Sequence, residues 1–401
     1  MKLNKAKANW TGGAALALAM IWTGSARAEP EFILDARLRS EIVDQDGLSE
    51  TAQALTLRTR IGIDSGPGHD FRFLIEGENV LHLLDDFNST TNGNTVYPVV
   101  ADPEATELNR AQIAYTGFEG TTLTLGRQRV ILGDARYLGN VGFRQNEQTF
   151  DAFRATLQQV ENLTLNYLYL DRVHRILGDD HPAGDWDLDG HIVTAEYSAS
   201  AGRLSGFAYL IDNQDVMALS TATYGVRWQG EIAQDGSPTF TYALEYAHQT
   251  DYANNPLSID LGLFRANANV AHNGWSAGLG IENLEGDGSR GFSTPLATLH
   301  AFQGWADVFL ATPANGLRDI YVRGGWNVSD PPFGRTLSFG AFYHDFEAEN
   351  GGGSLGSEFD IVATSRLNDH VVLQLKGAFY NGPAGGPADR NKFWIALTFT
   401  R

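Results

Sequence analysis

The feature that most constrains the fold is an alternation of apolar and polar residues that recurs along almost the whole chain. In one example, Ala222, Tyr224, Val226 and Trp228 share one face of an extended segment, and polar residues fill the other face. An alternation with a period of two over about ten residues predicts half-exposed β-strands. Each such segment therefore has one face suited to an apolar environment and one suited to water.

The length of these segments favours a membrane protein over a soluble sandwich or propeller. Strands of soluble sheets usually have about five or six residues, whereas a tilted strand that crosses a bilayer needs about ten. We therefore expect a transmembrane antiparallel β-barrel of the outer-membrane type, all-β, with about eighteen strands. The expected strands lie near 32–42, 53–63, 70–82, 107–117, 121–130, 148–158, 162–174, 190–200, 203–212, 220–232, 239–249, 260–271, 275–284, 317–327, 335–346, 357–367, 370–380 and 391–400.

The connections between these segments support the same prediction. Tight turns are expected at 119–120, 161–162, 201–202, 273–274 and 368–369, and longer excursions at 84–106, 131–147, 175–189, 285–316 and 381–390. Short periplasmic turns that alternate with long extracellular loops are typical of outer-membrane barrels. Residues 302–310 resemble a further strand. Counting them would put the C-terminus at the extracellular edge of the barrel instead of the periplasmic edge, so we assign them to a loop.

The N-terminus has the pattern of a secretory signal peptide. Lys2, Lys5 and Lys7 precede a short apolar run, and a small-x-small site ends at Ala28. We therefore predict a cleaved signal at 1–28. No linker divides the rest, so 29–401 is expected to form one barrel domain in the outer membrane of a Gram-negative bacterium.

Composition excludes some partners and some chemistry. The formal net charge is −19, which argues against a nucleic-acid partner because such a partner favours a basic face. The chain has no cysteine, so neither disulfides nor thiol chemistry are available. Stability must come from packing and from a closed hydrogen-bonded sheet.

Arginines gather on the polar faces of the expected strands, whereas most acidic residues fall in loops. Pairs spaced two apart, such as Arg37 with Arg39 and Arg58 with Arg60, share one strand face. If the apolar face contacts lipid, the arginines line a water-filled lumen and can hold carboxylates with two parallel hydrogen bonds. The alternative is that neighbouring glutamates neutralise them and that they only brace the wall. The other basic residues that this register directs into the lumen are Arg72, Arg110, Arg154, Arg172, Arg227, Arg265, Arg323, Arg366 and Lys376.

The segment 125–154 is the most arginine-rich part of the chain, and glycines break it into bends. Its arginines are Arg127, Arg129, Arg136, Arg144 and Arg154. Arg127 has the same strand parity as Leu125, so a regular strand would direct it to lipid. Either a bulge at Gly126 switches the face, or the strand ends there and the arginines enter the pore with the loop. We favour the second arrangement.

This segment, with residues 304–322, resembles the alginate export family of outer-membrane barrels. The resemblance implies a monomeric barrel whose arginine-rich lumen passes a polyuronate. By position it extends to Arg127, Arg129, Asp134, Arg136, Arg144, Gln145, Asn146, Asp151 and Arg154 in the first segment, and to Trp305, Asp307 and Arg318 in the second.

One spacing suggests a metal site, and no other cofactor is expected. Asp185, Asp187 and Asp189 precede Gly190, and Glu196 stands at the twelfth position, as in a calcium-binding loop. No helices flank the segment, so a solvated acidic loop is the alternative. A calcium ion at these three aspartates is the one cofactor that the sequence suggests.

Nothing in the sequence indicates an enzyme. Ser354 lies in a G-x-S-x-G match, but this match occurs in a glycine-rich loop without the strand-turn-helix context that a nucleophile requires. The histidines show no zinc spacing. An outer-membrane hydrolase is the third interpretation, after the two kinds of channel described below.

We therefore expect a passive outer-membrane channel. The first hypothesis is diffusion of an anionic polysaccharide or oligosaccharide, such as a polyuronate, with the loops 131–147 and 285–316 narrowing the pore. An export role would also allow a periplasmic machinery as a partner. The alternative is an uptake porin for small anionic or neutral solutes.

Overall fold

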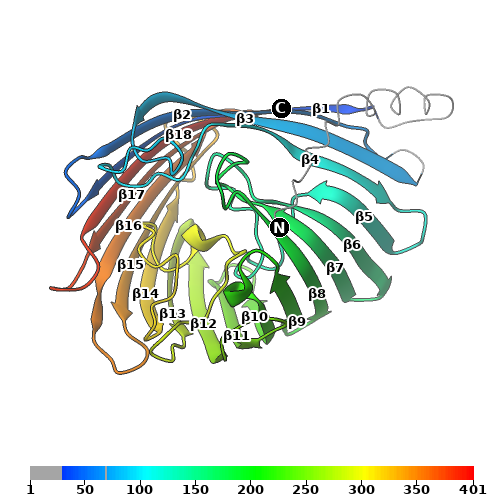
Figure 1. The fold of residues 1–401 in the computed structure, drawn as a ribbon. Coiled ribbons are helices and arrows are strands. Elements are labelled where there is room, and N and C mark those ends of the chain that lie inside the picture. Colours follow the sequence, from blue (N-terminus) through cyan, green and yellow to red (C-terminus); the bar gives the residue numbers. More distant parts are fainter. Residues whose placement is uncertain (1–28, 68–69) are drawn as a thin grey trace, which may run out of the picture.

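The computed structural model describes residues 29–67 and 70–401, which form one closed antiparallel barrel of eighteen strands. Figure 1 shows these strands as a continuous wall around an interior that loops enter. The predicted signal peptide at 1–28 lies outside the described residues. No described helix is long and apolar enough to cross a membrane.

All eighteen predicted strands are confirmed, and most of their ends differ by only a few residues. Their bounds are β1 Glu31–Gln45, β2 Ala52–Asp64, β3 Phe71–Asp86, β4 Ala105–Tyr115, β5 Thr121–Gln128, β6 Thr149–Val160, β7 Leu163–His174, β8 Asp185–Ala199, β9 Gly202–Asn213, β10 Thr221–Ile232, β11 Thr239–Asp251, β12 Asp260–His272, β13 Trp275–Leu284, β14 Leu317–Asn327, β15 Thr336–Glu347, β16 Ser354–Arg366, β17 Val371–Asn381 and β18 Arg390–Thr400.

The wall closes where the last strand pairs with the first. β1 and β18 run antiparallel in one unbroken register from Asp35 opposite Thr400 to Gln45 opposite Arg390. Every other strand pairs with its two sequence neighbours. Closure matters because a bilayer offers no water to the backbone, so a spanning sheet must satisfy its own N–H and C=O groups.

The connections differ in length between the two edges of the barrel. Those at one edge, the loop edge, include 87–104, 129–148 and 285–316, whereas those at the other, the turn edge, include 161–162, 200–201 and 273–274. β1 begins and β18 ends at the turn edge. Because such barrels usually carry their short turns at the periplasmic side, we expect the turn edge to face the periplasm.

The outer face of the wall is apolar and carries exposed aromatic residues near both edges. Such aromatic girdles mark the two interfaces of a membrane. Exposed aromatic residues near the turn edge include Phe32, Phe71, Trp275 and Trp326, and those toward the loop edge include Tyr343, Phe359 and Phe393.

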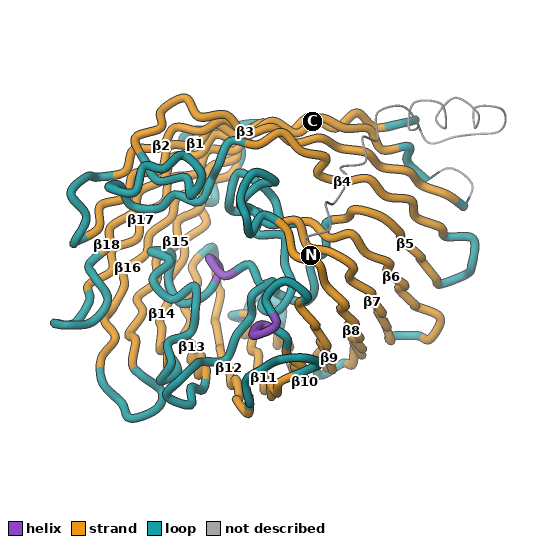
Figure 2. Tube along the Cα trace, in the orientation of Figure 1, coloured by secondary structure: helices purple, strands orange, loops and turns teal. Residues whose placement is uncertain are grey.

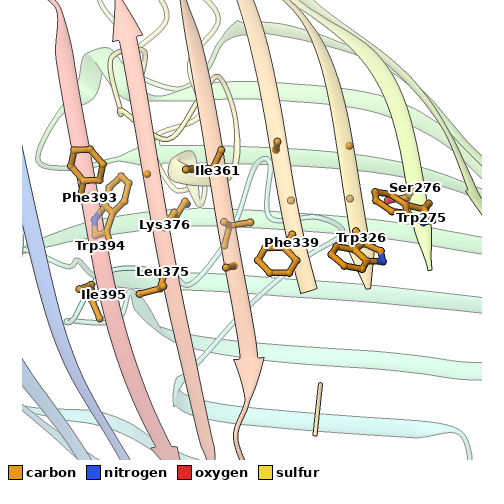
Figure 3. Close-up of a pocket in the computed structure, with 17 residues that line it drawn as sticks. Trp275, Ser276, Trp326, Phe339, Ile361, Leu375, Lys376, Phe393, Trp394 and Ile395 are labelled. Atoms are coloured by element: carbon orange, nitrogen blue, oxygen red, sulfur yellow. The ribbon is translucent and has the colours of Figure 1, made fainter. Parts of the chain in front are cut away.

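Small residues leave a shallow apolar trough in this outer face, across β13 to β18. Ala277, Gly324 and Ala341 stand opposite one another on three successive strands. The stacked rings of Trp275 and Trp326, with centroids 5.1 Å apart, form its border toward the turn edge (Figure 3). The trough is part of the surface that contacts lipid.

Two loops from the loop edge fold into the barrel, as Figure 2 shows. We call residues 129–148, between β5 and β6, the first inner loop, and residues 285–316, between β13 and β14, the second inner loop. The assignment of 302–310 to a loop is confirmed, since these residues lie in the second inner loop and form no strand.

The inner loops give the barrel an apolar core on the inside of the wall. Val130 and Leu138 of the first inner loop pack with Leu168, Ile192 and other inward residues of β6 to β9. A second cluster joins Phe309 of the second inner loop to the wall at β15, β17 and β18. The loop-edge half of the lumen is therefore partly filled with apolar side chains.

Candidate functional site: the arginine-lined lumen

Most of the predicted lumen arginines do point inward, but many of them are buried beneath the inner loops. Arg39, Arg58, Arg60, Arg136 and Arg144 are almost inaccessible to solvent. Each of these lies within 4.0 Å of a carboxylate. The alternative in which arginines brace the structure therefore applies to this group.

The tip of the first inner loop is fixed by a buried ion-pair network. Arg144 contacts Glu41 of β1 at 3.2 Å and Asp307 of the second inner loop at 3.0 Å. Arg39 of β1 donates to Asp102 and to the carbonyl of Phe143. Because the charges are paired and hydrogen-bonded, this network ties both inner loops to the wall.

The other end of the first inner loop is held through Glu147. Its carboxylate accepts hydrogen bonds from Arg129 and from Asn109 of β4, and Arg60 lies 3.4 Å away. Burial opposes ionisation, but the hydrogen bond from Arg129 and the charges of Arg60 and Arg129 lower the pKa of Glu147 to about 2. Arg110 beside this group is paired with Glu76 at 2.6 Å.

The two inner loops also bind each other directly. The backbone N–H of Gly139 donates to the carbonyl of Leu296 at 2.9 Å, and that of Thr298 donates to the carbonyl of Ala135 at 3.0 Å. The guanidinium of Arg136 lies over the ring of Phe302, 4.7 Å from its centroid. The two loops therefore form one assembly inside the barrel.

A row of charged side chains crosses the inner face of β10 to β13, next to this assembly. Arg227, Glu245, Arg265 and Glu282 stand opposite one another on four successive strands. Asp134 of the first inner loop joins the row by contacting Arg227 and Arg265. Burial opposes the ionisation of Asp134, but the two arginines lower its pKa to about 2.

Two lumen arginines, Arg154 and Arg323, each donate to the side-chain amide oxygen of an asparagine on the wall. Arg154 of β6 donates to the side-chain oxygen of Asn166 at 3.0 Å, and Arg323 of β14 donates to that of Asn269. Neither has a carboxylate within 4.0 Å among the described residues. A neutral amide orients a guanidinium without cancelling its charge, so both arginines present a net positive charge to the lumen.

Arg37 has a third kind of environment. Its guanidinium donates to the side-chain oxygen of Gln145 at 2.8 Å and to the carbonyl of Gly142 at 3.0 Å. All these acceptors belong to the first inner loop. Arg37 therefore supports the loop backbone, with its charge directed at neutral oxygens.

Arg127 is not in the lumen, and the prediction that the strand ends at Gly126 is wrong for this residue. β5 continues to Gln128 in regular register, with Arg127 opposite Ala111 and Asp151. Arg127 pairs with Asp151 at 2.9 Å on the face of Leu125, which is 58 % exposed on the outside. Arg129 lies beyond the strand end and, unlike Arg127, turns inward with the loop.

The predicted calcium loop is not formed. Residues 185–189 belong to strand β8, so Asp185, Asp187 and Asp189 extend along the strand and do not converge. Arg172 of β7 pairs with Asp185 at 2.6 Å and with Asp187 at 2.5 Å. In the described part of the chain, no three His, Asp or Glu side chains are grouped to hold a metal ion. The prediction required a turn at Gly190, but Gly190 continues strand β8, so the predicted loop is wrong.

The sequence did not reveal which residues neutralise or orient the charge of each arginine. Asn166 and Asn269, which hold Arg154 and Arg323, lie on neighbouring or next-nearest strands. Asp102 and Glu147, which hold the first inner loop, lie in long connections. Strand parity shows which face a residue takes, but the pairing across strands required the register.

No family model and no curated protein sequence matches the chain, whereas solved structures share its fold. OccAB4 of Acinetobacter baumannii superposes with a TM-score of 0.72 at 16% identity and covers 94% of this chain and 98% of its own. OpdL of Pseudomonas aeruginosa gives 0.67 at 17% identity, covering 92% and 99%.

OpdK of Pseudomonas aeruginosa, in a structure with vanillate, gives a TM-score of 0.68 at 14% identity and covers 92% of this chain and 98% of its own. These neighbours are outer-membrane porins, and the comparison gives no support to the alginate export family in particular. The chain therefore has the fold of the eighteen-stranded Occ/Opd outer-membrane porins.

Proposed function

We propose that this protein is a passive outer-membrane channel for the uptake of small anionic solutes. The observation that carries the proposal is the state of Arg154 and Arg323, whose charges are oriented by amides and cancelled by no carboxylate within 4.0 Å in the described residues. Two such groups of one sign on the low-dielectric wall of a lumen attract anions and repel cations.

The arrangement of the inner loops favours small solutes over a polymer. The first and second inner loops are tied to each other and to the wall by backbone hydrogen bonds and buried ion pairs. A polyuronate chain would have to pass beside these loops along the whole lumen, whereas a small solute needs only a short path past them. The fold neighbours, one of them determined with vanillate, also favour a small solute.

Reconstitution in planar bilayers tests this function. The wild-type channel should select anions over cations in a potassium chloride gradient, and benzoate should permeate. Replacing both Arg154 and Arg323 with asparagine should lower the anion-to-cation permeability ratio by roughly threefold or more, since two unscreened charges leave the lumen.

The matched control is Arg335→Gln. Arg335 is exposed near the turn edge and pairs with Asp369, so its replacement removes an arginine without changing the lumen. The ratio should stay at the wild-type value in this variant. A cation-selective wild type, or a double variant with unchanged selectivity, would contradict the proposal.

A further inference from the structure

A side pocket of about 390 Å³ opens inside the barrel, between the first inner loop and the wall of β8 to β11. Its volume falls within the range of about 300–1,000 Å³ that is usual for small-molecule sites. The residues that line it and carry the argument are Tyr137, Glu196, Ser205, Phe207, Arg227 and Gln229.

The charges around this pocket are balanced. Arg227 pairs with Asp134 and with Glu245, and both carboxylates also contact Arg265. Glu196 has its own cation in Arg203, 3.6 Å away. The pocket therefore has no unpaired charge that would hold a full anion or cation by itself.

Several polar groups of the pocket still have unused hydrogen-bonding capacity. Both ion pairs of Arg227 go through Nη1, so Nη2 is left without a partner within the described residues. The side chains of Ser205 and Gln229 likewise form no hydrogen bond in the part of the chain that the structure covers. Together they offer both donors and acceptors.

One wall of the pocket is aromatic. The rings of Tyr137, Phe207 and Tyr209 form a cluster, with centroids 4.8 Å apart between Tyr137 and Phe207 and 5.2 Å apart between Tyr137 and Tyr209. Phe207 is partly exposed, whereas Tyr209 is buried. Phe207 and Tyr137 therefore present an apolar surface beside the free polar groups.

We propose that this pocket binds an uncharged, polyhydroxylated ring, that is, a monosaccharide. A pyranose presents C–H groups on its faces, which pack against the aromatic wall, and hydroxyl groups around its edge. These hydroxyls use the free capacity of Ser205, Gln229 and Arg227, so neither partner is left with an unsatisfied polar group. The balanced charges favour a neutral solute.

The inference rests on the proposed function only in that a solute reaches the pocket through the lumen. In the alternating row of charges, Ser205 stands between Glu196 and Arg227 on successive strands. Because its two neighbours have opposite charges, a charged side chain of either sign at this position would stand beside one like charge, and a longer side chain would occupy the space of the pocket. The neutral serine is what leaves room for a ligand.

Calorimetric titration of the detergent-solubilised protein with D-glucose tests the pocket without any measurement of conduction. The wild type should bind glucose, and Phe207→Ala should weaken the affinity at least about tenfold, because it removes the exposed aromatic face. Phe339→Ala is the matched control, since Phe339 lies on the lipid face of β15, and it should bind like the wild type.

A second variant covers the case in which Phe207→Ala fails to fold. Gln229→Ala changes an incompletely buried side chain that makes no hydrogen bond in the described chain, and it should also weaken glucose binding several-fold. The inference is overturned if the wild type does not bind glucose, or if both variants bind it unchanged. It is equally overturned if benzoate binds as tightly and loses the same affinity in Phe207→Ala.

The double replacement of Arg154 and Arg323 separates this inference from the proposed function. It should lower anion selectivity and leave glucose binding at the wild-type level, because neither arginine lines the pocket. An anion-selective channel that does not bind glucose contradicts only the saccharide site. A glucose-binding protein without anion selectivity contradicts only the proposed function.

Discussion

At the scale of single residues, Glu147 shows how one buried carboxylate can make the pore sensitive to acid. Its pKa is lowered to about 2, because the hydrogen bond from Arg129 and the charges of Arg60 and Arg129 outweigh burial. A carboxyl group whose pKa is lowered by folding stabilises the folded arrangement above its usual pKa of about 4.5 and loses this contribution as the pH falls toward 2. We therefore expect the first inner loop to loosen in that window, with a rise in single-channel conductance. Glu147→Gln should show part of the altered conductance already at pH 7 and a smaller change than the wild type below pH 4.5, where Asp134 of the same loop still titrates. If both proteins gave the same pH profile, Glu147 would not be the group that holds the loop.

At the scale of elements, the strands could be predicted from the sequence, whereas the inner loops could be placed only in part. Alternation predicted each strand because a membrane wall imposes opposite demands on its two faces. The ion pairs of Arg144 could not be predicted, because its partners Glu41 and Asp307 are far away in the sequence. The same limit explains Arg127 and the three aspartates of β8, for which the register decided the outcome. Arg144→Met should separate the two inner loops, since it leaves buried carboxylates without one of their cations at a cost of about 3–5 kcal/mol. The expected result is a larger and noisier conductance in planar bilayers. Arg366→Met, at an exposed arginine near the turn edge, is the control and should conduct like the wild type. If Arg144→Met conducts like the wild type, with no added current noise, backbone hydrogen bonds alone hold the two inner loops together.

At the scale of the whole molecule, the unequal lengths of the connections at the two edges predict how the barrel is oriented in the membrane. The longer connections, including both inner loops, leave the loop edge, and the two-residue turns lie at the other edge. If the turn edge faces the periplasm, a residue in the connection 175–184 is accessible from outside the cell and one in the connection 233–238 is not. The chain has no cysteine, so single cysteines introduced as Asp180→Cys and Ser237→Cys each give an unambiguous label. In intact cells, a membrane-impermeant maleimide should modify Asp180→Cys and leave Ser237→Cys unmodified, and both should react once the cells are lysed. The opposite labelling pattern would mean that the barrel has the reverse orientation in the membrane. It would place the inner loops at the periplasmic mouth, so that solutes from outside would meet Arg154 and Arg323 before the inner loops.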